Sequence, residues 1–505
     1  MSATWRQQSS AQDLQVFIHD RSSLRLLAMC LFPETRLGVS VIARQHVARK
    51  ALREEKLFRP SPSDVVRLLG LTKENQDVKS VSYMHSLWRL HYEGQLRYKQ
   101  DRVLRQLQRL SKAVQETLTV PVVDQETKLF RWLAVSQIVP SPKITEYRGK
   151  DAFIVHFGID GNPATVGVPY GSSRLLVSIP PAELHSVYKS AHRTVAHLFQ
   201  KYLRDPSTPS DVVSSSMFKG GGYKNITIRS SRQQDKLMVI AQFRIGHFKP
   251  ERLNEEARRL ADYFLGRTFN ELSPASRIAS LYFQRVPKSF RHADETLFEH
   301  LGGDTYFEET ILGRTFHVSP QTFFQINVDC AEILFRTVIE QCFLDKNTVL
   351  LDLGCGAGVH SIVLSDHVKR AIGIDVNSCC ILDAEQNARL NGVENAKFIR
   401  GRLETAPAEF LDDMANGREK LIAIANPGRW GLMAESVKAL RRFPALKTLI
   451  YVSCYPYESA FFNFVSLLRH PNEEYVGQPF KLIKAIPVDM FPQTIHYELI
   501  LLFER

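Results

Sequence analysis

The stretch LLDLGCGAGVHS, residues 350–361, decides the fold of the C-terminal part of the chain. An apolar run leads into three glycines at alternate positions, Gly354, Gly356 and Gly358, and further apolar residues follow. Glycine lets the backbone turn tightly and lets a ligand approach it closely. The stretch therefore predicts a strand, a glycine-rich turn and a helix, with a ligand bound at the turn.

After residue 330, short apolar runs alternate with helical stretches. The runs are NTVLLDLG, RAIGIDV, NAKFIRG, KLIAIAN and KTLIYVSC. This alternation predicts a parallel, doubly wound α/β domain, to which we assign residues 326–505. Ligands bind such sheets beyond the carboxyl ends of the strands. Asp375 ends the second run, where it is placed to accept hydrogen bonds from a ribose diol, and Cys454 ends the last one.

The preceding segment, residues 76–325, has a different composition and a different spacing of apolar residues. Residues 87–118 repeat apolar residues at helical spacing among many Arg, Lys and Gln residues, which predicts a long, basic, amphipathic helix. From about 138 to 282, short β-branched and aromatic runs are separated by Gly, Pro, Asp and Asn, which indicates a mostly antiparallel sheet with one or two helices. We therefore expect an N-terminal α+β region in front of the doubly wound domain.

The first 75 residues are expected to be a presequence or a disordered tail. The stretch MCLFPETRLGVSVIARQHVARKALR, residues 29–53, is rich in arginine and contains one acid, Glu34. Such composition is typical of a mitochondrial presequence, although Asp13 and Asp20 precede it and a plain disordered tail is the alternative. We favour the mitochondrial matrix as the location, with cytosol or nucleus as the alternative.

Composition narrows the class of protein. The 505 residues are 44% hydrophobic, enough for two or three cores, and no apolar run approaches the roughly 20 residues that cross a bilayer. The seven cysteines include no CxxC pair and no matching Cys/His cluster, so we expect neither a metal site nor an iron–sulfur cluster. The net charge of +12 favours a polyanionic partner, nucleic acid above all, and a basic protein of a basic compartment such as the mitochondrial matrix is the equal alternative. We expect a monomer.

Two motifs indicate the class of reaction. DLGCGAG resembles motif I of S-adenosylmethionine-dependent methyltransferases, and Asp375 is then similar to their ribose-binding acid. NAD-binding sheets share such a turn, but NARLNG, residues 387–392, favours the methyltransferase class. Amino-methyltransferases follow an Asn-Pro pair with Pro and an aromatic residue. Here Gly428 and Arg429 follow Asn426 and Pro427, which disfavours methylation of an exocyclic amine.

Residues from about 80 to 505 resemble the RNA uracil-5-methyltransferases, which form 5-methyluridine in tRNA and rRNA. The resemblance lies in SPQTFFQIN (319–327), motif I, NPGRWGL (426–432), YVSC (451–454) and FPQTIHYE (491–498), in the family's order and spacing. YRGKDAF (147–153) and SLYFQ (280–284) are similar to the animal branch, and Asn426 in place of the usual Asp is similar to its mitochondrial member. The resemblance implies a class I methyltransferase domain, an N-terminal RNA-binding region, and tRNA, or else rRNA, as partner.

The chemistry assigns two roles. Uracil C5 is a poor nucleophile because the ring shares its electrons with two carbonyl groups. A thiolate that adds to C6 gives C5 carbanion character, and a base must then remove the C5 proton. Cys454 is the candidate nucleophile and Glu498 the candidate base, and the resemblance implies the same roles.

The resemblance also implies the binding residues. Gln325, Gly354, Asp375 and Asn426 match positions that bind S-adenosylmethionine. Phe153 matches a phenylalanine that stacks on RNA, and Arg148 and the basic helix are candidate phosphate contacts.

Departures from the family pattern leave alternatives open. Tyr455 stands where the family commonly has Asn, Gly428 where it has a small residue or Pro, and Tyr497 directly precedes the base. They motivate a second interpretation, an RNA-binding chaperone with a weakened methyltransferase site. An amino-methyltransferase is the third.

Overall fold

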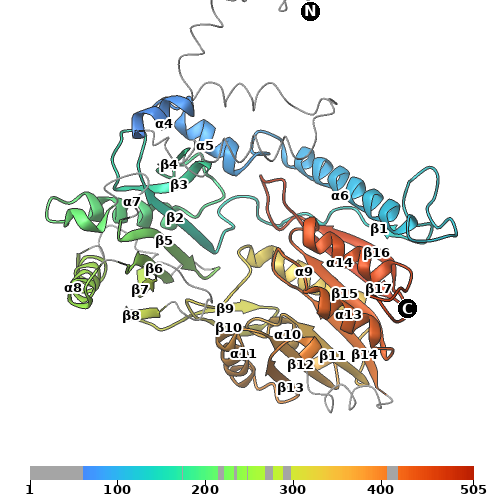
Figure 1. The fold of residues 1–505 in the computed structure, drawn as a ribbon. Coiled ribbons are helices and arrows are strands. Elements are labelled where there is room, and N and C mark those ends of the chain that lie inside the picture. Colours follow the sequence, from blue (N-terminus) through green and yellow to red (C-terminus); the bar gives the residue numbers. More distant parts are fainter. Residues whose placement is uncertain are drawn as a thin grey trace, which may run out of the picture. The chain divides into compact units, whose positions relative to one another are not determined.

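Two β-sheets organise the described part of the chain (Figure 1). The computed structural model describes residues 61–172, 175–213, 221–232, 236–246, 248–267, 277–287, 297–405 and 419–505. The described residues form one unit that begins at Ser61. The predicted presequence lies almost entirely in residues 1–60, outside the described residues.

The larger sheet has eight strands. Its spatial order is β1 (Ala134–Val135), β16 (Lys481–Val488), β17 (Glu498–Glu504), β15 (Leu446–Ser453), β14 (Lys420–Ala425), β11 (Thr348–Leu353), β12 (Arg370–Asp375) and β13 (Ala396–Arg400). All neighbours pair in parallel except β17, which is antiparallel to both β15 and β16. The chain runs outward from β11 to β13 and returns on the other side at β14, so the strand order reverses beside β11. The doubly wound α/β domain predicted from the sequence is confirmed.

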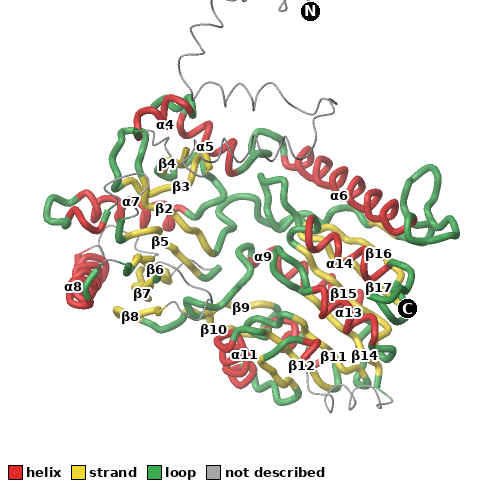
Figure 2. The backbone as a smooth tube through the Cα atoms, viewed as in Figure 1, coloured by secondary structure: helices red, strands yellow, loops and turns green. Residues whose placement is uncertain are grey.

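Helices cover both faces of this sheet (Figure 2). They are α6 (Tyr92–Gln115), α9 (Val328–Cys342), α10 (Val359–Val363), α11 (Ser378–Leu390), α13 (Ala434–Arg442) and α14 (Glu458–Leu468). Successive strand residues point to opposite faces, so Leu350 packs with α9, α10 and α11, whereas Leu351 packs with α6, α13 and α14. Each core is built almost entirely from Leu, Ile, Val, Ala and Phe, as expected for strands that are buried on both sides.

The second sheet has seven strands. Its order is β4 (Leu175–Ile179), β3 (Thr165–Ser172), β2 (Lys150–His156), β5 (Tyr223–Ser230), β6 (Lys236–Arg244), β7 (Arg277–Val286) and β8 (Leu297–Gly303). Only β6 and β7 pair in parallel, so the sheet is mostly antiparallel, as the sequence pattern indicates.

Further elements lie outside these two sheets, and among them β9 and β10 pair as a two-stranded antiparallel sheet. The remaining elements are α4 (Pro62–Leu68), α5 (Gln76–Met84), α7 (Ser190–Arg204), η1 (Ser210–Val212), α8 (Pro250–Ala261), η2 (Asp262–Arg267), β9 (Phe307–Ile311), β10 (Arg314–Val318), η5 (Ser365–His367) and η6 (Leu403–Thr405). Residues of α4, α7 and α8 pack with the seven-stranded sheet in one hydrophobic core.

Two boundaries differ from those drawn from the sequence. Residues 61–75, assigned to the tail, are folded: Ser61 and Asp64 form a capping box, and Val65 is buried against the seven-stranded sheet. The basic helix α6, assigned to the N-terminal region, packs on the eight-stranded sheet through Val103 and Leu107. Burial of this apolar face outweighs proximity in sequence, so α6 and β1 complete the C-terminal domain.

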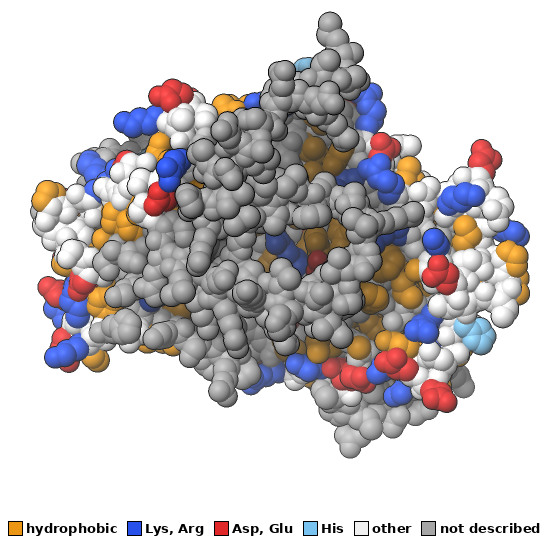
Figure 3. All heavy atoms as spheres, turned by 45° about the horizontal axis from the view of Figure 1, so that its top comes forward, with side chains coloured by type: hydrophobic (Ala, Val, Ile, Leu, Met, Phe, Trp, Pro, Cys, Tyr) orange, Lys and Arg blue, Asp and Glu red, His pale blue; other side chains and the backbone are white. Residues whose placement is uncertain are grey.

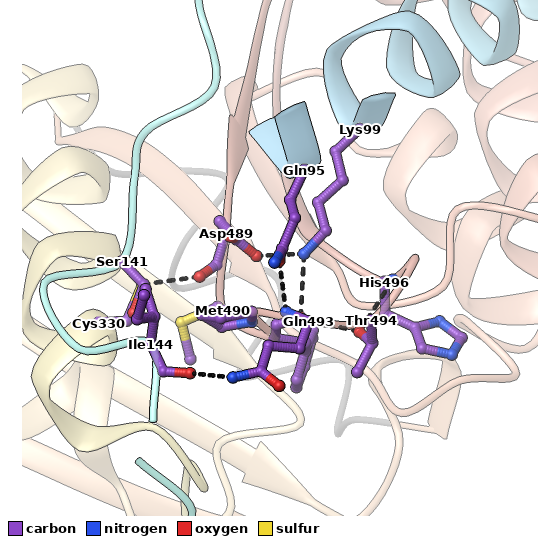
Figure 4. A network of polar contacts seen from close by, with 12 residues as sticks. Gln95, Lys99, Ser141, Ile144, Cys330, Asp489, Met490, Gln493, Thr494 and His496 are labelled. Carbon is purple, nitrogen blue, oxygen red and sulfur yellow. Dashed lines mark hydrogen bonds and ion pairs between the residues drawn. The ribbon is translucent and has the colours of Figure 1, made fainter. Parts of the chain in front are cut away.

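A buried ion pair joins α6 to the loop between β16 and β17 (Figure 4). Lys99 and Asp489 are both fully buried, and the Lys99 ammonium also donates to the Phe491 carbonyl at 2.9 Å. Burial lowers the pKa of Lys99, whereas the neighbouring carboxylate opposes that shift. A buried cation with two oxygen partners holds this loop in one position relative to α6.

The same loop is fixed at Gln493, whose φ of +68° lies in the left-handed region. The Gln493 amide N–H donates to Oε1 of Gln95 at 2.6 Å, and the side-chain amide donates to the Ile144 carbonyl at 3.0 Å. The Tyr147 hydroxyl donates to the next carbonyl upstream, that of Pro492, at 3.0 Å. Left-handed backbone is costly for a non-glycine residue, so these contacts compensate for local strain.

We predict that Lys99→Met destabilises the protein by about 3–5 kcal/mol, because it leaves the Asp489 carboxylate buried without its cation. Urea denaturation measures the loss. Lys112→Met removes an exposed lysine from the same helix and is expected to cost less than about 0.5 kcal/mol. The double variant Lys99→Met/Asp489→Leu should recover most of the loss. Equal stability of Lys99→Met and Lys112→Met would contradict the prediction.

Candidate active site

A cavity of about 1040 Å³ lies at the carboxyl ends of β11, β12, β14 and β15. The side where the strand order reverses is the expected binding position in an open α/β sheet. The cavity lining includes all of the site residues predicted from the sequence except Phe153: Arg148, Gln325, Gly354, Asp375, Asn426, Cys454 and Glu498. Residues separated by up to 350 positions in the chain are thereby brought to one cavity.

The glycine-rich turn forms one wall. Gly354 and Gly356 have φ values of +76° and +53°, which side-chain-bearing residues rarely adopt. The Gly356 N–H donates to one Asp375 carboxylate oxygen at 3.0 Å, and the Asn377 N–H donates to the other at 2.9 Å. These bonds fix the carboxylate at the end of β12, where its remaining lone pairs face the cavity and fit a ribose diol.

Strand register places the candidate nucleophile opposite the candidate base. Ser453, the last residue of β15, pairs with Leu499 on antiparallel β17. One step further along this register sets Cys454 opposite Glu498, and directly opposed residues project to the same face. Both side chains line the cavity, and Glu498 is close enough to influence the pKa of Cys454.

Burial governs the protonation of this pair. Burial raises the pKa of Glu498 to about 8, and among the described residues its Oε2 atom has no hydrogen-bond partner. Burial and, to a smaller extent, the nearby Glu498 raise the pKa of the Cys454 thiol to about 11, although the positive charge of Arg429 opposes this shift. Near neutral pH the site thus holds a thiol beside a carboxyl group that is mostly protonated, with a pKa shifted toward the range suited to a general base.

Phe153 is not at the cavity, and this sequence-based assignment is not supported. Its side chain is fully buried in the core of the seven-stranded sheet and packs edge-to-face on Tyr188 at 5.5 Å. On β2 it alternates with exposed neighbours, so it points inward. Phe323, which is 66% exposed and lines the cavity, offers an aromatic face instead.

Arg148 lines the cavity and is held by a buried polar chain. Its Nε donates to Asp151 at 2.5 Å, and the other Asp151 oxygen lies 2.7 Å from Nδ1 of His192. The guanidinium also lies over the Tyr188 ring, 5.6 Å from its centroid. These contacts hold the guanidinium group in one position. Because the group is planar, they also fix the direction of its Nη atoms.

Sequence reasoning missed a wall built by the N-terminal region. Met84, His85 and Tyr188 line the cavity. The His85 ring is buried edge-on to Tyr188 at 5.3 Å, and its Nδ1 has no hydrogen-bond partner among the described residues. Burial, assisted by His185 and Arg148, lowers the pKa of His85 to about 3, so the ring is neutral. No local motif signals these residues, because only the tertiary fold brings them to Cys454.

Within the described residues, no group of three or more His, Cys, Asp or Glu side chains is arranged to hold a metal ion. A search of the same residues also finds no helix that is both long and apolar enough to cross a membrane.

Known proteins are similar to this chain in sequence. The sequence model of a family described as "Methyltransferase domain" matches residues 344–448. Human tRNA (uracil-5-)-methyltransferase homolog A is 35% identical over 458 residues, covering 89% of this chain and 72% of the relative. Human homolog B is 34% identical, covering 83% of this chain and 82% of the relative.

A solved structure shares the fold. The tRNA (uracil-54, C5)-methyltransferase of Pyrococcus abyssi, in complex with S-adenosyl-L-homocysteine, superposes with a TM-score of 0.55 at 20% identity. The match covers 83% of this chain and 84% of that protein.

The buried Glu498 predicts a pH-dependent difference in stability between the protein and its Glu498→Gln variant. The folded-state pKa of about 8 lies above the ordinary value of 4.5. Between these values the folded state retains a proton that the unfolded state releases, so this residue's contribution to stability is lost as the pH rises. Urea denaturation without ligands should show the variant gaining stability over the native protein from pH 5 to pH 8, with no further change above. A stability difference between the two proteins that does not change with pH would refute the raised pKa of Glu498.

Proposed function

The chain belongs to the tRNA (uracil-5-)-methyltransferase family, and from this premise we propose that it methylates C5 of a uridine in RNA. The observation that carries the proposal is that Cys454, directly after β15, and Glu498, the first residue of the antiparallel neighbour β17, line one cavity. Methylation of an amine needs neither group, and a site without catalytic use has no reason to hold both.

The residues around the glycine turn fit S-adenosylmethionine. Gly354 and Gly356 allow close backbone approach, Asp375 presents its fixed carboxylate, and Gln325 and Asn426 add amide groups to the same cavity. When bound, the cofactor supplies an electrophilic methyl group. Asn426 replaces the acid expected from the family pattern. It keeps an acceptor oxygen and adds donors but lacks the charge, so we expect an effect on rate rather than on reaction type.

Cys454 and Glu498 act in sequence on the uracil ring. The Cys454 sulfur forms a bond to C6, the C5–C6 π electrons move toward the C4 carbonyl, and C5 becomes nucleophilic. The positive charge of Arg429 favours the thiolate that begins this step. Once C5 carries the methyl group, the Glu498 carboxylate removes the C5 proton, and the electrons left behind re-form the double bond and expel the thiolate. Activity should therefore fall as the pH drops below the Glu498 pKa of about 8.

The uridine must leave its stack to reach the thiol. Phe323 and Tyr455 line the cavity with aromatic surface that suits an extruded base, and Arg148 presents a fixed guanidinium for a phosphate or a base edge. We propose a tRNA substrate, with the T-loop uridine as target, and mitochondrial small-subunit rRNA as a further one.

An activity assay distinguishes the proposed function from the second interpretation, an RNA chaperone with a weakened site. Unmodified tRNA and labelled S-adenosylmethionine are incubated with the protein, and the RNA is digested to nucleosides. We expect label in 5-methyluridine. Label in a methylated amine would indicate an amino-methyltransferase, and absence of label would support the chaperone.

A tRNA that carries 5-fluorouridine tests the nucleophile, because fluorine replaces the proton that Glu498 removes and the covalent adduct is trapped. We expect an adduct stable to denaturing gels, and its complete loss in Cys454→Ala. Cys379→Ala is the matched control, since Cys379 is a half-buried free thiol outside the cavity lining. An adduct that persists in Cys454→Ala would assign the nucleophile elsewhere.

We propose the mitochondrial matrix as the site of action, on the arginine-rich composition of residues 29–53. A reporter fused behind residues 1–60 should reach mitochondria and lose its N-terminal segment there. Import should decline when the arginines of residues 36–53 are replaced by glutamine. Recovery of the reporter from cytosol with an intact N-terminus would argue for the cytosol or nucleus.

A further inference from the structure

We propose that a strip formed by α6, α14 and the segment before α14 binds the single-stranded RNA that flanks the target uridine. The inference rests on the proposed function and adds a contact path outside the cavity. The strip comprises Tyr98, Arg102, Arg105, Arg109, Tyr457, Phe461 and Phe462.

One edge of α6 carries the cations. At 100° per residue, Tyr98, Arg102, Arg105 and Arg109 fall within an arc of about 60°. Arg105 and Arg109 are exposed, and among the described residues neither forms an ion pair. Of the exposed acids of the same helix, Glu93 lies on the other flank, whereas Asp101 lies one turn before Arg105 and borders this edge. The edge thus carries three arginines beside one acid, an excess of positive charge rather than an even mixture of both signs.

Aromatic rings of α14 and of the residue before it hold two of these arginines. The Arg102 guanidinium lies over the Tyr457 ring at 5.6 Å and donates to its hydroxyl at 3.0 Å, and Arg109 lies over Phe461 at 5.7 Å. Next to them Phe462 is 67% exposed. Fixed guanidinium groups beside exposed aromatic faces form the combination that binds single-stranded nucleic acid, in which phosphates meet cations and bases stack on rings.

The strip connects to the cavity. Tyr455, which lines the cavity, contacts Tyr457 with 5.2 Å between ring centroids. The Tyr457 hydroxyl in turn lies 3.1 Å from that of Tyr497, the residue before the candidate base. A strand whose uridine enters the cavity can therefore continue over Tyr455 and Tyr457 onto α6. The space-filling view shows Lys and Arg side chains beside hydrophobic ones on the described surface (Figure 3). Glu458 is the exposed acid closest in sequence to this path.

Two variants test the strip without touching the cavity. Arg105→Gln/Arg109→Gln removes two charges, and Phe462→Ala removes the exposed ring. The matched control is Arg389→Gln/Lys397→Gln, which removes two exposed charges from α11 and β13, at the opposite edge of the sheet from β1. Fluorescence anisotropy measures the Kd for unmodified tRNA in the presence of S-adenosylhomocysteine, over a series of salt concentrations, and thermal unfolding verifies the fold of each variant.

We expect both strip variants to raise the tRNA Kd by ~5-fold or more, with the control within ~2-fold. The slope of log Kd against log salt should fall by about 1.4 in the double-arginine variant, at ~0.7 per single-strand phosphate contact, and stay unchanged in Phe462→Ala. Equal effects of the strip and control variants would overturn the inference and leave the surface free for a protein partner. Because binding is measured without methyl transfer, failure of the proposed reaction would be seen separately in the nucleoside assay.

Discussion

The buried pair of Lys99 and Asp489 is the constraint on which the site depends. Asp489 directly follows β16, and the loop it begins leads to Glu498 at the start of β17. Two charges taken out of water are costly unless each meets the other at close range, so the pair has one acceptable geometry. The left-handed backbone at Gln493 is likewise favourable in one arrangement only. Its strain is tolerated while contacts from α6 and from residues 144 and 147 persist. Together they fix the loop that carries the candidate base, through partners lying some 350 to 400 residues upstream.

The direction of β17 explains why the candidate nucleophile and the candidate base share one edge of the sheet. Parallel strands present only their carboxyl ends there, as Asp375 and Cys454 do. Because β17 runs antiparallel, it brings its first residue to that edge. Glu498 thus lies at a strand start and Cys454 follows a strand end, yet they oppose each other. Burial on this edge then withholds solvent from Glu498 and raises its pKa toward the range in which it can exchange protons near neutrality.

Much of this could be predicted from the sequence, for identifiable reasons. The glycine turn, Asp375 and Cys454 stand at the ends of strongly apolar runs, so local pattern and the general geometry of parallel sheets place them. Phe153 failed because a resemblance in sequence does not tell which face of β2 is buried, and there the alternation turns it into the core. His85 and Tyr188 could not be found, because their approach to the cavity depends on packing between segments far apart in the chain. The spacing of apolar residues correctly predicted the helix α6. Amphipathicity, however, does not identify the sheet that a helix covers.

The seating of α6 on the eight-stranded sheet bears on how such a protein evolves. Val103 and Leu107 belong to a core whose other members, apart from further α6 residues and Leu129 and Phe130, lie after residue 348, and β1 adds an edge strand to the same sheet. A gene fragment beginning at residue 326 would encode a domain with a bare apolar face and no Lys99 for Asp489. Recombination at that point would yield an insoluble fragment rather than a catalytic domain that folds independently. The helix and the catalytic half are therefore inherited together, whereas the segments between them are constrained mainly where they line the cavity, as Arg148 and Tyr188 do.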